Sequence, residues 1–354
     1  MKKVLIDARL LSNKPTGISR YTKEIVHALT SHFGYDNVLV LVDTKYKYIG
    51  NYNILYTKLK PYNPIHYLLF SLFIYRQKLS VYYSTFYSGV YFKDTKTKHV
   101  LTVHDLMYLR ITDYFSTLKI WNIFSKILFN FIVKLSLRSS DLIISVSNST
   151  KNDVLEYFNA ESIVIGEGVN YLDEKPQSTI NIFEKLNITK EKYFLYVGNF
   201  RRQKNVNFLI KAFILSNANY QLVLVGDCKL VKKENASIIF AGILEDHEIQ
   251  ELYQNCLAFV MPSFYEGFGL PILEAFCSGA RVLSSNQGAL VEFENLGINY
   301  FSPFNINELI SLIQNIDKIA KPTEIEIDLA RKAYSWKYQT DKIINSIESL
   351  ICRQ

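Results

Sequence analysis

Short runs of aliphatic and β-branched residues alternate along this chain with longer segments of helical period, and the alternation occurs twice. The runs that predict buried strands are Val4–Asp7, Val38–Val42, Val81–Ser84, Val100–Val103 and Leu142–Val146, followed by Tyr193–Val197, Leu222–Val225, Ile238–Phe240, Leu257–Val260 and Arg281–Leu283. Helices are expected at Ile18–Ser31, Ile65–Gln77, Leu118–Arg138 and Asn148–Phe158, and later at Val206–Ser216, Asp246–Asn255, Pro271–Ser278 and Asn307–Asp317. Because strand–helix alternation produces parallel sheets covered on both faces, the predicted fold class is α/β with two doubly wound domains.

The length of 354 residues also suits two domains. The stretch Gly168–Thr179 is polar and contains Pro176, which makes it the best candidate for a linker. We therefore expect a first domain over 1–170 and a second over 171–335. Ligands of open α/β sheets bind beyond the carboxyl ends of the strands, so the loops that follow strands are the segments to examine for chemistry.

Several classes of protein lack their sequence signatures here. No GxGxxG follows a strand and no GxxxxGK[ST] occurs, which disfavours dinucleotide-dependent oxidoreductases and P-loop enzymes. The wide spacing of the cysteines excludes a CxxC redox pair or a zinc cluster; they are Cys228, Cys256, Cys277 and Cys352.

The chain offers no clear membrane-crossing or export segment. Its first residues do not resemble a signal peptide. The apolar stretches Tyr67–Tyr75 and Ile120–Leu137 fall short of a membrane span, the first in length and the second because it contains two lysines. We therefore expect a cytoplasmic protein.

The segment Pro262–Ala275 carries the most informative chemistry. A glycine-bearing loop follows a predicted strand, and a helix is expected to open at Pro271, where a proline removes no needed N–H. The free N–H groups of a helix start suit phosphate, and the glycines Gly267 and Gly269 let the backbone approach a ligand. Glu266 and Glu274 are good acceptors for sugar hydroxyls, so the segment favours a ligand with phosphate and polyol parts. The alternative is an ordinary turn with a charge near a helix start.

This segment resembles the E-x7-E motif, with its EGFGLP core, of the retaining, nucleotide-sugar-dependent glycosyltransferases of family 4, which have the GT-B fold. Other segments follow that family's patterns in the same order along the chain: Thr102–Leu106, Ser145–Ser147, Tyr196–Gly198, Lys204–Asn205, Leu252–Cys256, Gly279–Leu283 and Tyr334–Trp336. The resemblance implies two Rossmann-like domains that face a central cleft. It also implies that the first domain binds the acceptor and the second the donor, and that a C-terminal helix of about 336–354 packs back onto the first domain.

A basic segment near the start of the second half is expected to hold the donor diphosphate. Charge that builds on a departing diphosphate must be neutralised, by a metal or by fixed cations. The chain has no DxD pair, so we expect no metal and no cofactor, and assign the task to Lys204 with Arg201 or Arg202. The family often has an arginine at neighbouring positions instead, so the sequence does not decide which of Arg201 and Arg202 binds the diphosphate. A solvated turn is the alternative.

The resemblance implies roles for further residues of this donor site. Glu274 would bind the ribose, and Glu266 the sugar hydroxyls. The N–H groups of Gly267, Phe268, Gly269 and Leu270 would face the phosphates or the sugar, near Gly198.

His104 and Asp105 follow a predicted strand of the first half. A lone histidine is more often a satisfied hydrogen-bonding group than a catalyst. By resemblance, however, His104 contacts the donor sugar near its transferred carbon. Asp105 would orient the imidazole or bind acceptor hydroxyls.

The segment Thr16–Tyr21 is predicted to open a helix with Thr capping chemistry. The family keeps glycine here so that the loop can face the diphosphate and the acceptor. Gly17 is therefore assigned to the donor, and Ser19 and Arg20 to the acceptor side. An ordinary helix cap is the alternative.

The basic excess is confined to the first half of the chain. Residues 1–175 hold 22 Lys and Arg against 14 Asp and Glu, whereas residues 176–354 hold 18 against 19. An apolar stripe with interleaved lysines runs along Leu118–Arg138. It predicts either a core helix or, together with residues 62–78, a face that leans on an anionic bilayer. No RNP, KH or helix-turn-helix pattern is present, so nucleic acid is not expected as a partner.

The resemblance, in particular to bacterial mannosyl- and rhamnosyltransferases of surface-polysaccharide assembly, implies a retaining hexosyltransferase, and the missing DxD pair favours one that is metal-independent. It would move a sugar from a nucleoside-diphosphate sugar to a glycan or lipid-linked acceptor in cell-surface polysaccharide or lipopolysaccharide biosynthesis. GDP-mannose is favoured over UDP- or dTDP-sugars, and a peripheral position at the inner face of the cytoplasmic membrane fits the basic first half. The alternatives are a sugar-nucleotide epimerase, a phosphorylase, or a non-catalytic subunit of a glycan-synthesis complex.

Overall fold

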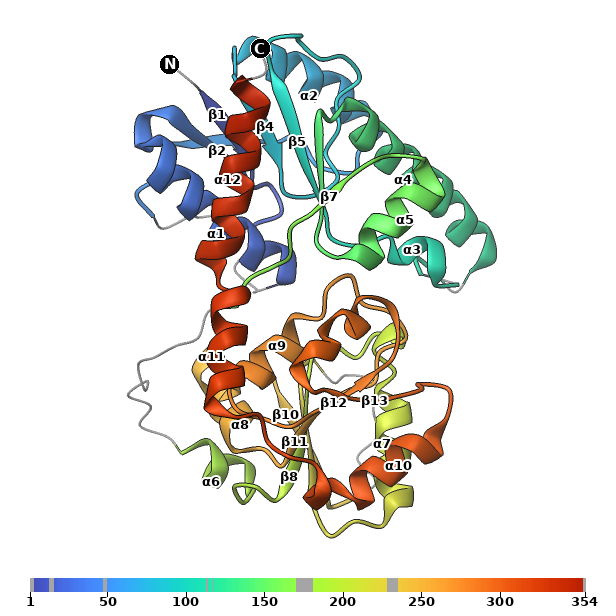
Figure 1. The fold of residues 1–354 in the computed structure, drawn as a ribbon. Coiled ribbons are helices and arrows are strands. Elements are labelled where there is room, and N and C mark those ends of the chain that lie inside the picture. Colours follow the sequence, from blue (N-terminus) through green and yellow to red (C-terminus); the bar gives the residue numbers. More distant parts are fainter. Residues whose placement is uncertain are drawn as a thin grey trace. The chain divides into compact units, whose positions relative to one another are not determined.

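The computed structural model describes residues 3–12, 16–46, 50–112, 114–116, 118–169, 181–227 and 235–352. It divides into two compact units (Figure 1). The first unit comprises Met1–Glu167 and Trp336–Gln354, and the second comprises Gly168–Ser335. Most of the predicted linker, residues 170–179, lies outside the described residues, as does Cys228.

The first unit is built on a seven-stranded parallel sheet of order β3-β2-β1-β4-β5-β6-β7. Its strands are β1 (Val4–Asp7), β2 (Val38–Asp43), β3 (Ile54–Thr57), β4 (Val81–Ser84), β5 (Lys98–Val103), β6 (Leu142–Ser145) and β7 (Ile163–Val164). Its helices are α1 (Gly17–Phe33), α2 (Pro64–Arg76), α3 (Met107–Arg110), α4 (Lys119–Ser139), α5 (Asn148–Phe158) and α12 (Trp336–Cys352), with a 3-10 turn η1 (Tyr35–Asn37).

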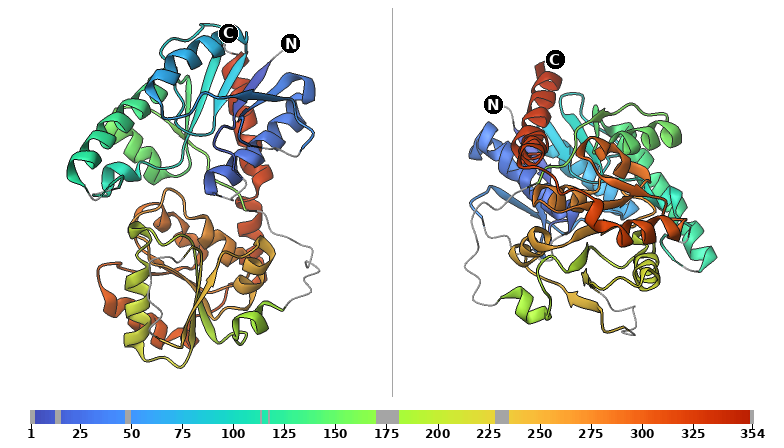
Figure 2. Two further views of the ribbon diagram at one scale, coloured as in Figure 1. Left: turned by 180° about the vertical axis from the view of Figure 1, so that it is seen from behind. Right: turned by 60° about the horizontal axis from the view of Figure 1, so that its bottom comes forward.

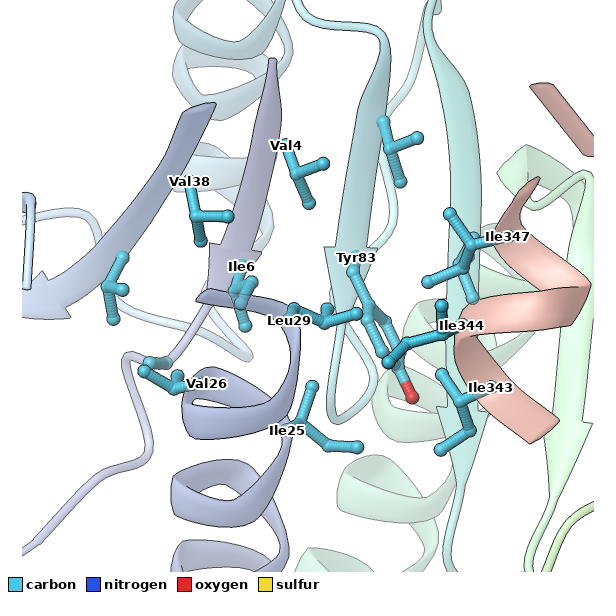
Figure 3. Packing of buried hydrophobic residues seen from close by; sticks show 14 of the residues in the cluster. Val4, Ile6, Ile25, Val26, Leu29, Val38, Tyr83, Ile343, Ile344 and Ile347 are labelled. Carbon is cyan, nitrogen blue, oxygen red and sulfur yellow. The ribbon is translucent and has the colours of Figure 1, made fainter. Parts of the chain in front are cut away.

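Alternate residues of these strands face different layers of the first unit. Val4 and Ile6 of β1 pack with α1 and α12, while Leu5 between them packs in a second cluster with residues of α2. Figure 3 shows Ile343 and Ile347 of α12 directed toward the sheet beside α1. The C-terminal helix therefore completes the core of the first unit.

The second unit is built on a six-stranded parallel sheet of order β10-β9-β8-β11-β12-β13. Figure 2 shows this unit, coloured yellow-green to red, from two further sides. Its strands are β8 (Tyr193–Val197), β9 (Gln221–Val225), β10 (Ile238–Gly242), β11 (Ala258–Met261), β12 (Val282–Ser285) and β13 (Asn299–Phe301). Its helices are α6 (Ile182–Leu186), α7 (Val206–Ser216), α8 (Asp246–Asn255), α9 (Leu270–Cys277), α10 (Ile306–Gln314) and α11 (Glu324–Ala333). The 3-10 segments are η2 (Arg202–Lys204), η3 (Gly288–Leu296) and η4 (Ile316–Lys318).

The α/β fold class with two Rossmann-like parallel sheets is confirmed, and three short strands were missed. Strand β3 (Ile54–Thr57) has only two aliphatic residues, both partly buried, beside the exposed Tyr56, so it gives no buried apolar run in the sequence. Strands β7 and β13 have only two and three residues. The predicted helices agree with the observed ones to within three residues at each end, and the largest difference is that α10 ends at Gln314, before η4.

Candidate functional site

The predicted donor-site residues of the second unit lie in segments that follow its strands, either in loops and the short η2 or in helix α9. Gly198 follows β8 and Gly226 follows β9, and these two loops touch. A Cβ atom added at Gly226 would lie 1.9 Å from the carbonyl oxygen of Gly198, at a φ of +138°. Only glycine allows this close approach. The loops beyond β8 and β9 are therefore fixed against each other at the carboxyl edge of the sheet.

A second position that favours glycine lies at the end of the loop between β11 and α9. Gly269 is the N-cap of α9 and has a φ of +108°, and a Cβ atom there would lie 2.7 Å from Cδ2 of Leu290. Phe268 beside it packs edge-to-face on Phe293, with the ring centroids 5.5 Å apart. The ring of Phe268 thus packs in support of the loop. The backbone of Phe268, and not its side chain, is available near the start of α9.

Lys204 and Glu266 form a partly buried ion pair. Nζ of Lys204 donates to Oε1 of Glu266 at 2.7 Å, and the two side chains are 12% and 10% exposed. The sequence assigned these residues to different parts of one ligand, whereas the structure shows them bonded to each other. The pair joins the segment after β8, which carries the cation, to the loop before α9, which carries the carboxylate.

Further hydrogen bonds tie the basic segment to the loop after β11. The N–H of Phe264 donates to the carbonyl oxygen of Gln203 at 2.8 Å, and Nδ2 of Asn205 donates to that of Pro262 at 3.2 Å. Gln203 is buried as a result, whereas Arg201 and Arg202 are both exposed. Either arginine therefore still fits the predicted contact with a diphosphate.

Glu274 lies in α9, one turn beyond its start. The hydroxyl of Tyr253, from α8, donates to Oε2 of Glu274 at 3.2 Å. A carboxylate has about four acceptor sites, so it can accept hydrogen bonds from more than one donor. The predicted ribose contact of Glu274 is compatible with this position.

His104 of the first unit follows β5 and is bonded at both ring nitrogens. Nδ1 lies 2.9 Å from Oε1 of Glu167, and Nε2 lies 3.0 Å from the carbonyl oxygen of Thr85. The side chains of His104 and Glu167 are 12% and 9% exposed. Burial alone would lower the pKa of His104, but the hydrogen bond and the negative charge of Glu167 outweigh it and raise that pKa above its usual range.

The prediction that Asp105 orients the imidazole is wrong. Oδ1 of Asp105 accepts from the N–H of Met107 at 2.9 Å, at the start of α3, and Glu167 bonds to the ring instead. The chain turns sharply after β5, and the short Asp105 side chain is taken up by that turn. Its predicted contact with acceptor hydroxyls stays a prediction.

Sequence reasoning missed Glu167. It follows β7, at the same edge of the sheet as His104. The signal available was a carboxylate between two glycines after a short apolar run, but the two-residue strand was not predicted and the glycines indicated a linker.

The start of α1 has the predicted cap. Oγ1 of Thr16 accepts from the N–H of Ser19 at 3.2 Å. Gly17 is exposed, with no atom within 4 Å of an added Cβ. Ser19, in contrast, is 1% exposed because it belongs to the buried stripe of α1, and among the described residues its Oγ has no hydrogen-bond partner. This burial argues against a direct acceptor contact for Ser19, while the position of Arg20 remains compatible with one.

A buried ion pair at the end of β1 was also missed. Nη2 of Arg9 lies 2.6 Å from Oδ2 of Asp7, which also accepts from the hydroxyl of Tyr82 at 2.8 Å. The guanidinium stacks 3.9 Å from the ring centre of Phe70. Burial alone would lower the pKa of Arg9, but the charge and the hydrogen bonds of Asp7 outweigh this effect and raise the pKa overall. The guanidinium is therefore charged. Its several hydrogen bonds make this pair a brace between β1, β4 and α2.

Helix α4 differs from one expectation, because it is long and apolar enough to cross a membrane by length and composition, with 28% of its apolar stretch buried. Its buried side, with Ile132, Val133 and Leu137, packs against residues of β5. Of the two alternatives for the apolar stripe, the core helix is wrong for these residues, because the stripe faces outward: Ile120 is 82% exposed, Phe124 59%, Ile127 66% and Phe131 47%.

This exposed surface extends toward α2. The N–H of Tyr91 donates to Oγ of Ser71 in α2, and its ring centroid lies 6.3 Å from that of Phe131 in α4. Other exposed apolar residues of α2 and α4 are Leu68, Leu69, Leu72, Tyr75, Trp121 and Ile123. Lys119, Lys134 and Arg138 of α4 are exposed as well. We call this set the α2–α4 surface.

Within the described ranges, no group of three or more His, Cys, Asp or Glu side chains is placed to hold a metal ion.

Two family models match this chain. One, described as Glycosyltransferase Family 4, matches residues 15–171, and the other, described as Glycosyl transferases group 1, matches residues 178–336. The first unit thus corresponds to one model and the second unit to the other. The chain belongs to the glycosyltransferases described by these two models and has the GT-B fold.

The curated relatives of this glycosyltransferase include bacterial mannosyltransferases. It is 29% identical over 239 residues to O-antigen chain mannosyltransferase B of Escherichia coli, a match that covers 61% of this chain and 62% of that protein. It is 27% identical to O-antigen chain mannosyltransferase RfbU of Salmonella typhimurium, covering 62% and 61%. The match spans less than two thirds of the length of these relatives.

Solved structures share the fold over the whole chain. Sucrose-phosphate synthase from Thermosynechococcus elongatus has a TM-score of 0.76 at 16% identity, with 100% of both chains covered. WaaG, a glycosyltransferase involved in lipopolysaccharide biosynthesis, has a TM-score of 0.72 at 14% identity, covering 97% of this chain and 99% of that one.

The glycines at the two helix starts give a matched pair of substitutions. Gly269→Ala should lower the free energy of unfolding by about 1–3 kcal/mol, because a side chain there is strained and crowded. Gly17→Ala should change it by less than about 0.5 kcal/mol, since Gly17 is helical and open. Denaturant unfolding monitored by circular dichroism measures both. An equal effect of the two substitutions would contradict the assigned backbone of the loop before α9.

Proposed function

We propose that this glycosyltransferase transfers a hexose from a nucleoside-diphosphate sugar, with retention of configuration, to a glycan or lipid-linked acceptor of a surface polysaccharide. The Lys204–Glu266 pair beside the start of α9 is the observation that carries the proposal. Lys204 has three N–H donors, of which Glu266 takes one, so the ammonium can bind a diphosphate without leaving its partner. The first N–H groups of α9 and its positive dipole end favour the same anion.

Glu266 and Glu274 would divide the polyol parts of the donor between them. Both are carboxylates held by a neighbouring donor, Lys204 for Glu266 and Tyr253 for Glu274. A carboxylate held in this way loses little side-chain entropy when it accepts a further bond from a ligand hydroxyl. Because Lys204, Arg201 and Arg202 supply fixed positive charge, we propose that transfer needs no metal ion.

Mannose is the sugar that we favour, with GDP as its carrier. The names of the relatives O-antigen chain mannosyltransferase B and RfbU support this choice. One structural neighbour, HepE of Anabaena, was solved with UDP and glucose, at a TM-score of 0.73 and 15% identity, so UDP-sugars belong in the same test. A transfer assay with GDP-, UDP- and dTDP-sugars, with and without EDTA, decides between them.

The same assay separates the competing functions. A phosphorylase would need inorganic phosphate as co-substrate, and an epimerase would change the sugar nucleotide without any acceptor. A non-catalytic subunit would turn over no donor. We expect donor consumption that depends on acceptor and not on phosphate.

Loss of the donor-site charges should reduce turnover without unfolding the chain. Charged hydrogen bonds are worth roughly 1.5–3 kcal/mol, so Lys204→Ala and Glu274→Ala should each lower kcat/KM for the donor by about tenfold or more. Lys211→Ala is the control, because Lys211 is an exposed lysine of α7 in the same unit. Rates of Lys204→Ala and Glu274→Ala equal to that of the control would refute the donor site.

We also propose that the α2–α4 surface rests on an anionic bilayer, where a lipid-linked acceptor would reside. A large exposed apolar face on a soluble domain marks a site of interaction, and cations at its edge suit anionic headgroups. Helix α4 is packed on the sheet along one side, so it would lie in the interface and not cross the membrane.

Vesicle sedimentation tests this contact. The protein should sediment with phosphatidylglycerol vesicles at low salt, and less so at high salt or with phosphatidylcholine alone. The double substitution Ile120→Asp with Ile127→Asp should reduce the partition coefficient by about tenfold or more, since each buried isoleucine contributes about 1.5–3 kcal/mol. Leu329→Asp, at an exposed leucine of the second unit, should have no effect. Binding that is absent, or that is insensitive to the α4 substitutions, would exclude this surface.

A further inference from the structure

The surroundings of His104 determine its protonation state. A carboxylate and a carbonyl oxygen can only accept hydrogen bonds, and they face Nδ1 and Nε2 of the ring. A neutral imidazole has one N–H and one lone pair, so one of its nitrogens would point a lone pair at an acceptor. Only the doubly protonated ring donates to both.

Thr85, whose carbonyl oxygen faces the ring, and the imidazole itself are held in place by further contacts. Oγ1 of Thr85 donates to the carbonyl oxygen of Asp7 at 3.0 Å and bonds to Oγ1 of Thr22 at 2.8 Å. The ring of Tyr21 contacts the imidazole edge-on, with the centroids 4.8 Å apart. The hydroxyl of Tyr21 bonds to Oγ1 of Thr102 at 3.0 Å. The imidazole is therefore restrained by groups from α1 and from the ends of β4 and β7, and ring rotation would break both of its hydrogen bonds.

The charged and titratable groups around His104 favour the cation. Glu167 and Asp105 both raise its pKa, and the hydrogen bond to Thr85 does so too. Tyr21, whose pKa burial raises well above its usual value, is neutral. Against these, burial of the ring lowers the pKa of His104, and the net direction is upward.

We propose that Glu167 is the positioning residue of His104, and that it keeps the imidazole doubly protonated so that His104 acts as a fixed cation and not as a general base. The protonation state of His104 is independent of the proposed function, whereas the effect of its charge on turnover rests on that function. A ring that donates at both nitrogens has no lone pair to take a proton from an acceptor hydroxyl. Its fixed positive charge, beyond the carboxyl end of β5, instead favours negative charge that develops on a group bound beside it.

Nitrogen NMR of the full-length protein with 15N-labelled histidine tests the protonation state without any substrate. The chain has six histidines, and His104→Gln assigns the signal of interest. We expect both ring nitrogens of His104 to show the protonated shift at pH 7.5. A neutral tautomer at that pH in the wild-type protein would overturn the proposal, whatever the enzyme's activity.

Glu167→Gln tests the positioning role, because glutamine keeps the shape of the side chain and an oxygen acceptor but removes the charge. The pKa of His104 should fall, so its proton should be lost at lower pH than in the wild type. The alkaline limb of the kcat–pH profile should shift to lower pH by about one pH unit for each unit by which the pKa of His104 falls. The KM for the donor should change little. Glu161→Gln, at an exposed glutamate just before β7, is the control.

The outcomes distinguish this proposal from the proposed function. If the NMR signal of His104 shifts in Glu167→Gln but no donor is turned over by any variant, the proposed function fails and the assignment of Glu167 stands. If the signal and the pH profile of Glu167→Gln both match the wild type, Glu167 has no positioning role. Glu167→Ala, should it fold, is expected to show the larger fall in the pKa of His104.

Discussion

Parallel strand pairing is the constraint on which the rest of this structure depends. Because all strands of a sheet run in one direction, every loop that follows a strand emerges at the same edge. In the first unit this brings together residues that follow β4, β5 and β7, namely Thr85, His104 and Glu167. In the second unit it brings the loop of Lys204, after β8, to the loop of Glu266, after β11. The chemistry of each unit is thus a consequence of its sheet topology.

At both edges a carboxylate holds a cation with little exposure to water. Such pairs are costly to bury, and removing one partner leaves an uncompensated charge, so they contribute little net stability. Their value here is position: each fixes a positive group at a strand end before any ligand binds. The pair of Asp7 and Arg9 has more hydrogen bonds and less exposure than the other two, and we interpret it as a structural brace.

The sequence predicted elements well where local signals were complete. Helix α5 begins and ends as expected, because Ser147 caps its first turn and Asn159 ends it in a left-handed conformation. The resemblance located the loop segments that carry the candidate residues. It did not predict the bonds of Lys204 to Glu266 and of His104 to Glu167, which join side chains 62 and 63 positions apart. Such bonds depend on strand order and on short strands such as β7, which no local pattern reveals.

We expect the loop before α9 and Lys204 to bind the diphosphate of a sugar nucleotide. A crystal structure of the full chain with GDP or UDP would show whether they do. Diphosphate oxygens should lie within hydrogen-bond distance of Nζ of Lys204 and of the first N–H groups of α9, and Glu274 should bond to the ribose. A nucleotide bound elsewhere, with the Lys204–Glu266 pair unchanged and no ligand beside it, would refute this donor site.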